Sequence, residues 1–178
     1  MGSNESHGFL ELAAKRYSVR KFLDRPVRQE DIDRILAAGH LAPTACNRQP
    51  QRILVINSKE GALKLRKCTE CHFGAPAALL VCYDRDDCWQ RKYDGKKSGE
   101  IDASIVATHM MLQAACLGVG MTWVMYFLPE AFKEEFGIPE HIEPVALLLM
   151  GYPAEDARPA PGHSEFKPMS ELVFYGGF

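Results

Sequence analysis

The chain has 178 residues, of which 47% are hydrophobic and 25% are charged, and its formal net charge is -2. This length suits one domain with a substantial core, and the composition is that of a globular protein. The charge disfavours nucleic acid or an anionic membrane as a partner. No apolar run reaches the ~18 residues of a membrane span. Because the N-terminus shows no signal-peptide pattern, we expect a cytoplasmic protein.

Hydrophobic periodicity and turn residues divide the chain into helices and strands in mixed order. We expect helices at 8–16, 29–40, 59–67, 101–117 and 129–136, and strands at 52–57, 77–83, 121–127 and 145–150. About four strands and five helices in this order predict a single α+β domain over residues 1–178, with helices packed on a central sheet.

The first motif follows the first helix, where Arg16–Phe22 read RYSVRKF. In an extended chain, side chains two residues apart point the same way, so Arg16, Ser18 and Arg20 would converge on one spot. Two guanidinium groups and a hydroxyl suit a terminal phosphate, which offers several acceptor oxygens and about two negative charges. A solvated basic turn is the alternative interpretation.

A second motif lies in the connection from a helix to a strand, where residues 41–52 read LAPTACNRQPQR. Thr44, Asn47 and Gln49 offer small hydrogen-bonding groups, and Pro43 and Pro50 stiffen the two flanks. Because amide side chains both donate and accept, this set suits a planar heterocycle with alternating donors and acceptors. A capped polar loop is the alternative.

Residues 68–72 read CTECH, which is the string used for covalent haem attachment. Haem attachment requires an exported apoprotein, and this chain shows no export signal. A zinc site of Cys68, Cys71, His72 and Cys88 would lack a second closely spaced ligand pair. We therefore favour free thiols at a helix end and expect no metal here.

Three further segments bear on the site. Residues 84–99 are polar and charged and carry Trp89 and Tyr93, so they form either a lid that selects substrate or a solvated loop. Helix 101–117 is apolar nearly all round, so we expect it to be the central buried helix. Its apolar repeat consists of Ile101, Ile105, Thr108, Leu112, Ala115 and Cys116. The ending LVFYGGF (172–178) is too apolar to stay in water without cost, so we expect it to pack on another surface, such as a second subunit.

The two motifs together resemble the FMN-dependent nitroreductase family, whose pattern runs R-x-S-x-R/K and then A-P-S-x-x-N-x-Q-P. The segment LGVGMTWVMYF after an Asp102-Ala103 helix start, GYP at 151–153 and a basic Lys167 before the apolar end also fit. The resemblance covers about residues 9–176. It implies a mostly antiparallel sheet of about four to five strands, a homodimer with an exchanged tail (about 160–178), and two FMN sites at the subunit interface.

The resemblance also implies a role for each matching residue. Arg16, Tyr17, Ser18 and Arg20 match the phosphate and ribityl contacts, Tyr17 mainly through its backbone, and Lys167 matches a second cation on the phosphate. Pro43, Thr44, Ala45 and Asn47, with Gln49 in the same motif, match the segment that the other subunit lays against the flavin. Met125 and Tyr126 match the stretch whose backbone faces the ring. Two departures stand out: Thr44 replaces a serine but keeps the hydroxyl, and Gln51 stands where an aromatic residue often follows.

The implied function is an FMN oxidoreductase that transfers hydride from NADH or NADPH, through the flavin, to nitroaromatic, quinone or similar small-molecule acceptors by a ping-pong mechanism. No catalytic side chain needs to be named. The alternatives are another chemistry of the superfamily, such as reductive dehalogenation or flavin fragmentation, and a non-catalytic flavin-binding or metal-binding protein.

Overall fold

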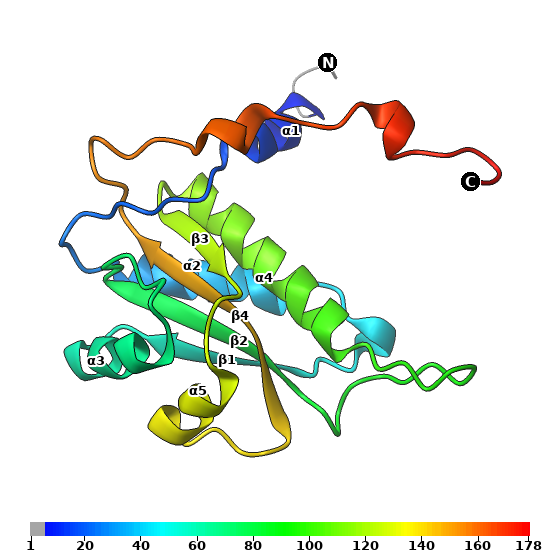
Figure 1. The fold of residues 1–178 in the computed structure, drawn as a ribbon, viewed down its shortest axis with the longest axis horizontal. Helices are drawn as coiled ribbons and strands as arrows, with labels where there is room; N and C mark the ends of the chain where they lie inside the picture. Colours follow the sequence, from blue (N-terminus) through cyan, green and yellow to red (C-terminus); the bar gives the residue numbers. More distant parts are fainter. Residues whose placement is uncertain (1–5) are drawn as a thin grey trace.

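The computed structural model describes residues 6–178. The strands β1 (Gln51–Ile56), β2 (Ala77–Asp84), β3 (Gly120–Val124) and β4 (Ile142–Gly151) form one antiparallel sheet in the order β1-β2-β4-β3 (Figure 1). The α-helices within this range are α1 (Ser6–Lys15), α2 (Gln29–His40), α3 (Lys59–Cys68), α4 (Gly99–Cys116) and α5 (Pro129–Phe136). The expected α+β class, with four strands and five helices, is confirmed. None of these helices is long and apolar enough to cross a membrane.

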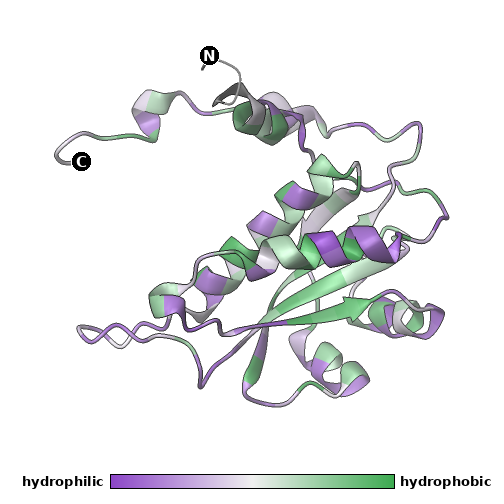
Figure 2. Cartoon of the chain, turned by 180° about the vertical axis from the view of Figure 1, so that it is seen from behind, coloured by the Kyte–Doolittle hydropathy of each residue, from purple (hydrophilic) through white to green (hydrophobic). Residues whose placement is uncertain are grey.

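The sheet is covered on both faces, and β2 shows how the sequence achieves this. Successive side chains of a strand point to opposite faces. Leu79 and Val81 pack in the core layer with α2 and α4, whereas Leu80 and Cys82 pack in the layer with α3 and α5. The strands are therefore hydrophobic along most of their length, while the segment between β2 and α4 is largely hydrophilic (Figure 2).

The expectation that helix 101–117 is buried all round is wrong for the single chain. α4 buries Ala103, Val106, Ala107, Met110 and Ala114 against the sheet and α2. Ile101, Thr108 and Cys116 from the expected apolar repeat lie exposed on the opposite side. The hydroxyl groups of Ser104 and Thr108 donate to carbonyls one turn earlier, at 2.7 Å and 2.8 Å. These two hydroxyl groups on the exposed side of α4 are therefore satisfied within the helix itself.

The strand expected at 121–127 is shorter in the structure. β3 pairs with β4 only from Gly120 to Val124, and the Phe127 N–H then bonds the Met125 carbonyl at 3.1 Å in a tight turn. β4 continues beyond Leu147, the partner of Val124, as far as Ile142, so the ladder ends because the chain turns away at Met125. Met125 and Tyr126 consequently leave the sheet with exposed side chains.

A buried carboxylate ties α2 to the end of β4. Arg28 donates twice to Asp31, with both distances 2.9 Å, and the Tyr152 hydroxyl donates to Asp31 at 2.7 Å. These hydrogen bonds, that from Arg28 first, hold the pKa of the Asp31 carboxyl below its ordinary value of 3.8. Because the folded pKa is the lower one, the stabilisation is complete above the unfolded pKa and is lost as the pH falls through the folded pKa.

Replacing Asp31 with asparagine is expected to lower the free energy of unfolding at pH 7 by about 1–3 kcal/mol, since the Arg28 and Tyr152 donors lose a charged acceptor. It should also flatten the loss of stability below about pH 4. Urea unfolding across pH 2.5–7 measures both effects. The matched control is Asp33→Asn in the same helix, where the carboxylate is exposed and bonds only Gln29. Parallel pH curves for the wild type and Asp31→Asn would contradict this account.

Candidate functional site

The basic segment 16–20 lies along the free edge of β3. Ser18 forms a parallel bridge with Met121, and the Val19 N–H donates to the Met121 carbonyl at 3.0 Å. A Cβ atom at Gly120 would lie 2.7 Å from a methyl carbon of Val19, which real Cβ contacts essentially never show. Glycine at this position therefore allows the segment to approach β3 closely enough to pair with it.

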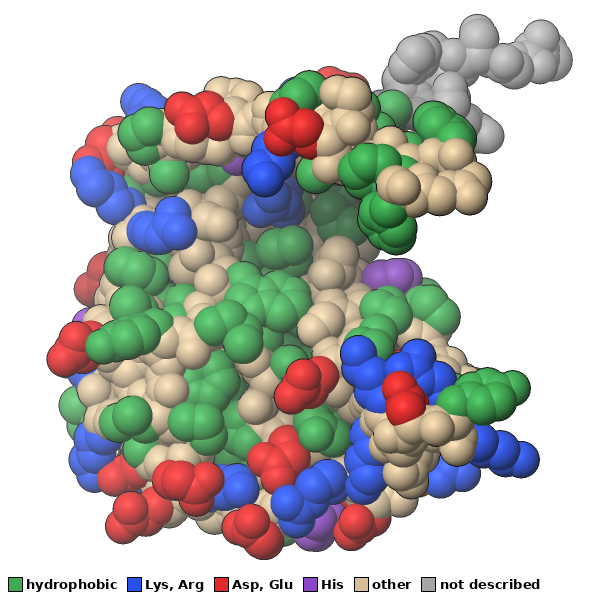
Figure 3. Space-filling model, turned by 45° about the vertical axis from the view of Figure 1, so that its right-hand side comes forward, with side chains coloured by type: hydrophobic (Ala, Val, Ile, Leu, Met, Phe, Trp, Pro, Cys, Tyr) green, Lys and Arg blue, Asp and Glu red, His purple; other side chains and the backbone are tan. Residues whose placement is uncertain are grey.

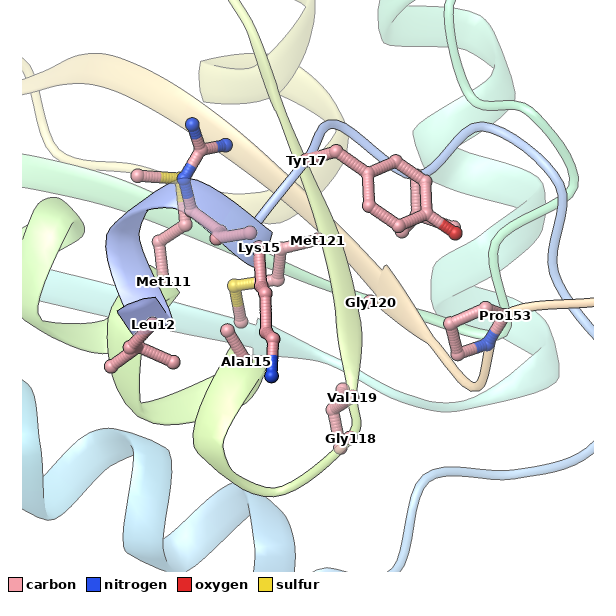
Figure 4. Close-up of a pocket in the computed structure, with 12 residues that line it drawn as sticks. Leu12, Lys15, Tyr17, Met111, Ala115, Gly118, Val119, Gly120, Met121 and Pro153 are labelled. Atoms are coloured by element: carbon pink, nitrogen blue, oxygen red, sulfur yellow. The ribbon is translucent and has the colours of Figure 1, made fainter. Parts of the chain in front are cut away.

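A cavity of about 220 Å³ lies beside this segment, between α1, the last turns of α4 and the start of β3. Figure 4 shows Leu12, Met111 and Ala115 at one end of it, and Tyr17 and Pro153 at the other. Arg16 also lines the cavity. The sequence interpretation gave Tyr17 mainly a backbone role, whereas here its side chain forms part of the wall.

Three of the cations expected at the phosphate are free to bind an anion. Within residues 6–178, Arg16, Arg20 and Lys167 form no ion pair with a carboxylate. Arg20 bonds only the Ser18 carbonyl, at 3.4 Å, and its guanidinium lies 6.0 Å from the centre of the Phe73 ring. The neighbouring Lys15 is instead paired with Glu11.

The chain end passes over this region before it leaves the body of the molecule. His163 contacts the Ala14 carbonyl through Nε2 at 3.3 Å, and its ring lies edge-on to Tyr17 with centroids 6.3 Å apart. Beyond His163 every residue is exposed, Lys167 included. The tail thus starts beside the basic segment and then extends away from the chain's own core (Figure 1).

The Met125–Leu128 segment is held against the end of α3. The Thr69 hydroxyl donates to the Tyr126 carbonyl at 2.5 Å, and the Leu128 N–H donates to the Cys68 carbonyl at 2.9 Å. Within the described part of the chain, the Tyr126 N–H has no hydrogen-bond acceptor. A backbone donor at this segment is therefore available to a ligand.

The loop from Thr44 to Gln49 has an unusual backbone. Cys46, Asn47 and Gln49 have positive φ angles of 51°, 52° and 52°, which is uncommon for residues other than glycine. Two contacts hold this conformation: the Thr44 hydroxyl accepts from the Gln49 N–H at 3.1 Å, and the Ala45 N–H donates to Asp102 at 2.9 Å. Strained loops held in this way are concentrated at functional sites.

Asp102 is the buried anchor of that loop. It is 2% exposed, and its second carboxylate oxygen accepts a hydrogen bond from the Ser98 hydroxyl at 2.7 Å. Asp102 is identifiable in the sequence as part of a motif, but its contact with Ala45 spans 57 residues and has no local signal. Thr69 likewise carries no motif that indicates its bond to Tyr126.

The expected site residues fall into two groups within one chain. Arg16, Tyr17, Ser18 and Arg20 lie at the end of α4 that leads into β3, whereas the Pro43–Gln49 loop lies at its beginning. The 18 residues of α4 span about 27 Å. A single chain therefore does not bring the residues expected to bind phosphate and the strained loop to one ligand.

The remaining candidates show no metal-binding arrangement. Burial raises the pKa of Cys68 to about 11 and that of Cys82 to about 12, which disfavours the thiolate form that binds metal or reacts. Cys68 is the last residue of α3 and its thiol donates to the Lys64 carbonyl. In the part of the chain that the structure describes, no group of three or more potential ligands could hold a metal ion.

The polar segment between β2 and α4 projects as a short hairpin. Gln90 and Lys97 form an isolated bridge, and Arg91 pairs with Asp94 near the tip. Tyr93 is 97% exposed, whereas the base of the segment contacts the Pro43–Gln49 loop, because the Arg48 side chain donates to the Asp87 carbonyl at 3.0 Å.

Comparison with known proteins identifies what this fold is similar to. A model described as the Nitroreductase family matches residues 13–73 and 68–152. A protein of Archaeoglobus fulgidus named NADH dehydrogenase/NAD(P)H nitroreductase is 33% identical over 163 residues, which cover 83% of this chain and 86% of that protein. The crystal structure of a nitroreductase family protein from Clostridium difficile 630 superposes with a TM-score of 0.90, at 46% identity, over 96% of this chain and 99% of the other. An FMN-dependent nitroreductase from Clostridium difficile R20291 superposes with a TM-score of 0.78, at 26% identity, over 95% and 99% of the two chains.

Proposed function

The chain belongs to the nitroreductase family, and we propose that it works as a homodimer that reduces nitroaromatic compounds, quinones or similar small acceptors by a ping-pong mechanism. It is an NAD(P)H-dependent oxidoreductase with FMN as its cofactor. We propose that residues 1–178 form one FMN-binding domain whose tail, from about 160, lies on the partner subunit. The single observation that carries the proposal is the set of unpaired cations beside the edge of β3.

The residues present at this edge fit the phosphate end of FMN. A phosphate carries about two negative charges and several acceptor oxygens. Among residues 6–178 no carboxylate pairs with Arg16 or Arg20, and Ser18 adds a hydroxyl between them. Lys167 would add a third cation from the tail. We assign phosphate and ribityl binding to these residues and to Tyr17, whose side chain lines the neighbouring cavity.

The flavin ring would lie against the Met125–Tyr126 backbone. The Tyr126 N–H has no acceptor among residues 6–178 and is free to donate to a ring acceptor. Bound FMN supplies hydride transfer, taking a hydride from NAD(P)H and passing electrons on to an acceptor. The chain's part is to bind the phosphate, orient the ring and offer this donor, and no side-chain acid or base is assigned.

A homodimer explains both the divided site and the exposed apolar surfaces. In an isologous dimer, two copies meet through the same surface in opposite directions. If the exposed sides of α4 meet in this way, the Pro43–Gln49 loop of one chain approaches the basic segment of its partner. Pro43, Thr44, Ala45, Asn47 and Gln49 would then contact the partner's flavin.

The tail supports the same assembly. Phe166, Tyr175 and Phe178 are 84%, 94% and 112% exposed, and such a run of large apolar side chains is costly in water. In Figure 3 hydrophobic side chains gather on this side of the molecule, which is hollowed beneath the layer formed by α1 and the tail. A second subunit would fill and cover these surfaces.

The purified wild-type protein is expected to show flavin absorption bands at about 370 and about 450 nm. It should lose the longer-wavelength band when NADH or NADPH is added without oxygen. Addition of a quinone or a nitroaromatic compound should then restore the band. If neither NADH nor NADPH removes the longer-wavelength band, the NAD(P)H step is contradicted, but the flavin site is not. If neither a quinone nor a nitroaromatic compound restores the band, the proposed substrates are contradicted. Initial rates measured while the concentrations of both substrates are varied would test the ping-pong order.

A further inference from the structure

Thr69 occupies an unusual position between two segments of the proposed site. It follows α3 directly, is 5% exposed, and uses its hydroxyl in two hydrogen bonds. The hydroxyl donates to the Tyr126 carbonyl at 2.5 Å and accepts from the Cys71 N–H at 3.0 Å. This buried hydroxyl therefore acts as both donor and acceptor, and both of its partners are backbone groups outside the helices and strands.

The segment that Thr69 contacts is anchored at its two ends more firmly than at Tyr126. Met125 accepts a contact from the Trp123 ring N–H through its sulfur at 3.1 Å, and the Phe127 ring packs edge-on against Phe132, whereas the Tyr126 side chain is 70% exposed. Besides the Thr69 bond, the backbone is held by the Phe127 N–H on the Met125 carbonyl and by the Leu128 N–H on the Cys68 carbonyl. The Thr69 bond is the contact that fixes the Tyr126 carbonyl itself, and so the orientation of the peptide unit between Tyr126 and Phe127.

The same turn reaches the phosphate side of the proposed site. Phe73 lies two residues after Cys71, has a positive φ of 47°, and faces the Arg20 guanidinium at 6.0 Å. The Thr69–Phe73 turn thus connects Arg20 with Tyr126. A single buried hydroxyl holds both the start of this turn, at Cys71, and the ring-facing segment.

We propose that Thr69 is a positioning residue for the flavin ring. Its hydroxyl fixes the peptide unit between Tyr126 and Phe127, and the N–H of that unit bonds the Met125 carbonyl. That second bond orients the peptide unit between Met125 and Tyr126, which carries the free Tyr126 N–H. The link to the ring rests on the proposed function, because that function assigns the segment to the flavin. The link between Thr69 and the segment is a property of the protein alone and is testable without cofactor.

Thr69→Val tests this proposal, because valine keeps the branched shape and removes the hydroxyl. Hydrogen exchange of the apoprotein, followed by mass spectrometry on peptides covering residues 125–128, is expected to be faster than in the wild type. The dissociation constant for FMN should rise about 2- to 12-fold, the value of one neutral hydrogen bond. The midpoint potential of the bound flavin should shift, which a loss of general stability would not cause. Thr69→Ser restores the hydroxyl and is expected to return all three quantities close to the wild type.

Thr122→Val is the matched control. Thr122 lies in β3, just before the same segment, and is 1% exposed, and its hydroxyl has no hydrogen-bond partner among residues 6–178. The same chemical change there should leave exchange at 125–128, FMN affinity and flavin potential unchanged. If Thr69→Val does not fold, Thr69→Ala replaces it in the same comparison.

The outcomes separate the proposal from the proposed function. Wild-type exchange in Thr69→Val, or equal defects in the serine and valine variants, would overturn the role of the hydroxyl. Faster exchange with unchanged FMN affinity and potential would overturn the link to the flavin. A wild-type protein that binds no FMN would overturn the proposed function, and with it that link, while the exchange comparison would still decide whether Thr69 fixes the segment.

Discussion

Simultaneous replacement of Arg16 and Arg20 by alanine is expected to leave the purified protein almost free of FMN. A charge-assisted hydrogen bond contributes about 1.5–3 kcal/mol, so each arginine is worth about 10- to 150-fold in affinity. The two effects are not additive, because both guanidinium groups would bind one phosphate, but the pair should exceed either single change. Flavin content per chain and FMN titration of the apoprotein measure the loss.

The control for this variant removes the same two positive charges elsewhere. Arg34 in α2 and Lys59 at the start of α3 are exposed, and neither forms an ion pair with a carboxylate in residues 6–178. The double variant Arg34→Ala/Lys59→Ala should keep wild-type flavin content. Because Arg16 and Arg20 have no carboxylate partner to lose, their removal should not lower the unfolding temperature of the apoprotein. Unchanged FMN affinity in Arg16→Ala/Arg20→Ala would refute the phosphate assignment.

Local sequence signals were sufficient for the elements that form the core. The continuous apolar run of β2, the prolines that flank α2 (Pro26 and Pro43) and the Pro129 and Gly137 ends of α5 are local signals, and those elements are predicted to within one residue of their observed ends. The strand expected at 121–127 is too long because its apolar run continues past Val124, whereas the chain turns at Met125 and is held against the end of α3 by the Leu128 N–H on the Cys68 carbonyl. The end of this strand is set by tertiary contacts, and no residue in 125–127 carries a local signal for it.

The error on α4 has a more informative cause. Its apolar repeat at Ile101, Ile105 and Leu112 has the spacing of a buried face, yet Ile101 is exposed and Ile105 and Leu112 are only half-buried. Ala103, Ala107 and Ala114 carry the close packing instead, because small side chains allow α4 to lie near the strands. A helix with two apolar faces is expected when the second face is covered by another chain. In the single chain the second apolar face of α4 is not buried, and in the proposed dimer the partner would cover it.

The strongest test of the divided site is complementation between two defective chains. Asn47→Val removes the amide and places a β-branched side chain at a φ of 52°, which such residues strongly disfavour. A homodimer of this variant would carry the defect at both flavins, as would a homodimer of Arg16→Ala/Arg20→Ala. Each variant alone is therefore expected to retain little FMN.

Unfolding and refolding the two variants together, in equal amounts and with FMN present, should restore part of the flavin binding. In a mixed dimer, one site would receive its cations from the Asn47→Val chain and its Thr44–Gln49 loop from the arginine-deficient chain, and would thus be intact. The other site would carry both defects. With random pairing, half of the dimers are mixed and half of their sites are intact, so the sample should bind about a quarter of the wild-type flavin. Separately refolded and then mixed proteins are the control, provided that subunits exchange slowly. No recovery after joint refolding, with mixed dimers present by mass spectrometry, would show that the loop and the basic segment do not serve one flavin across the interface.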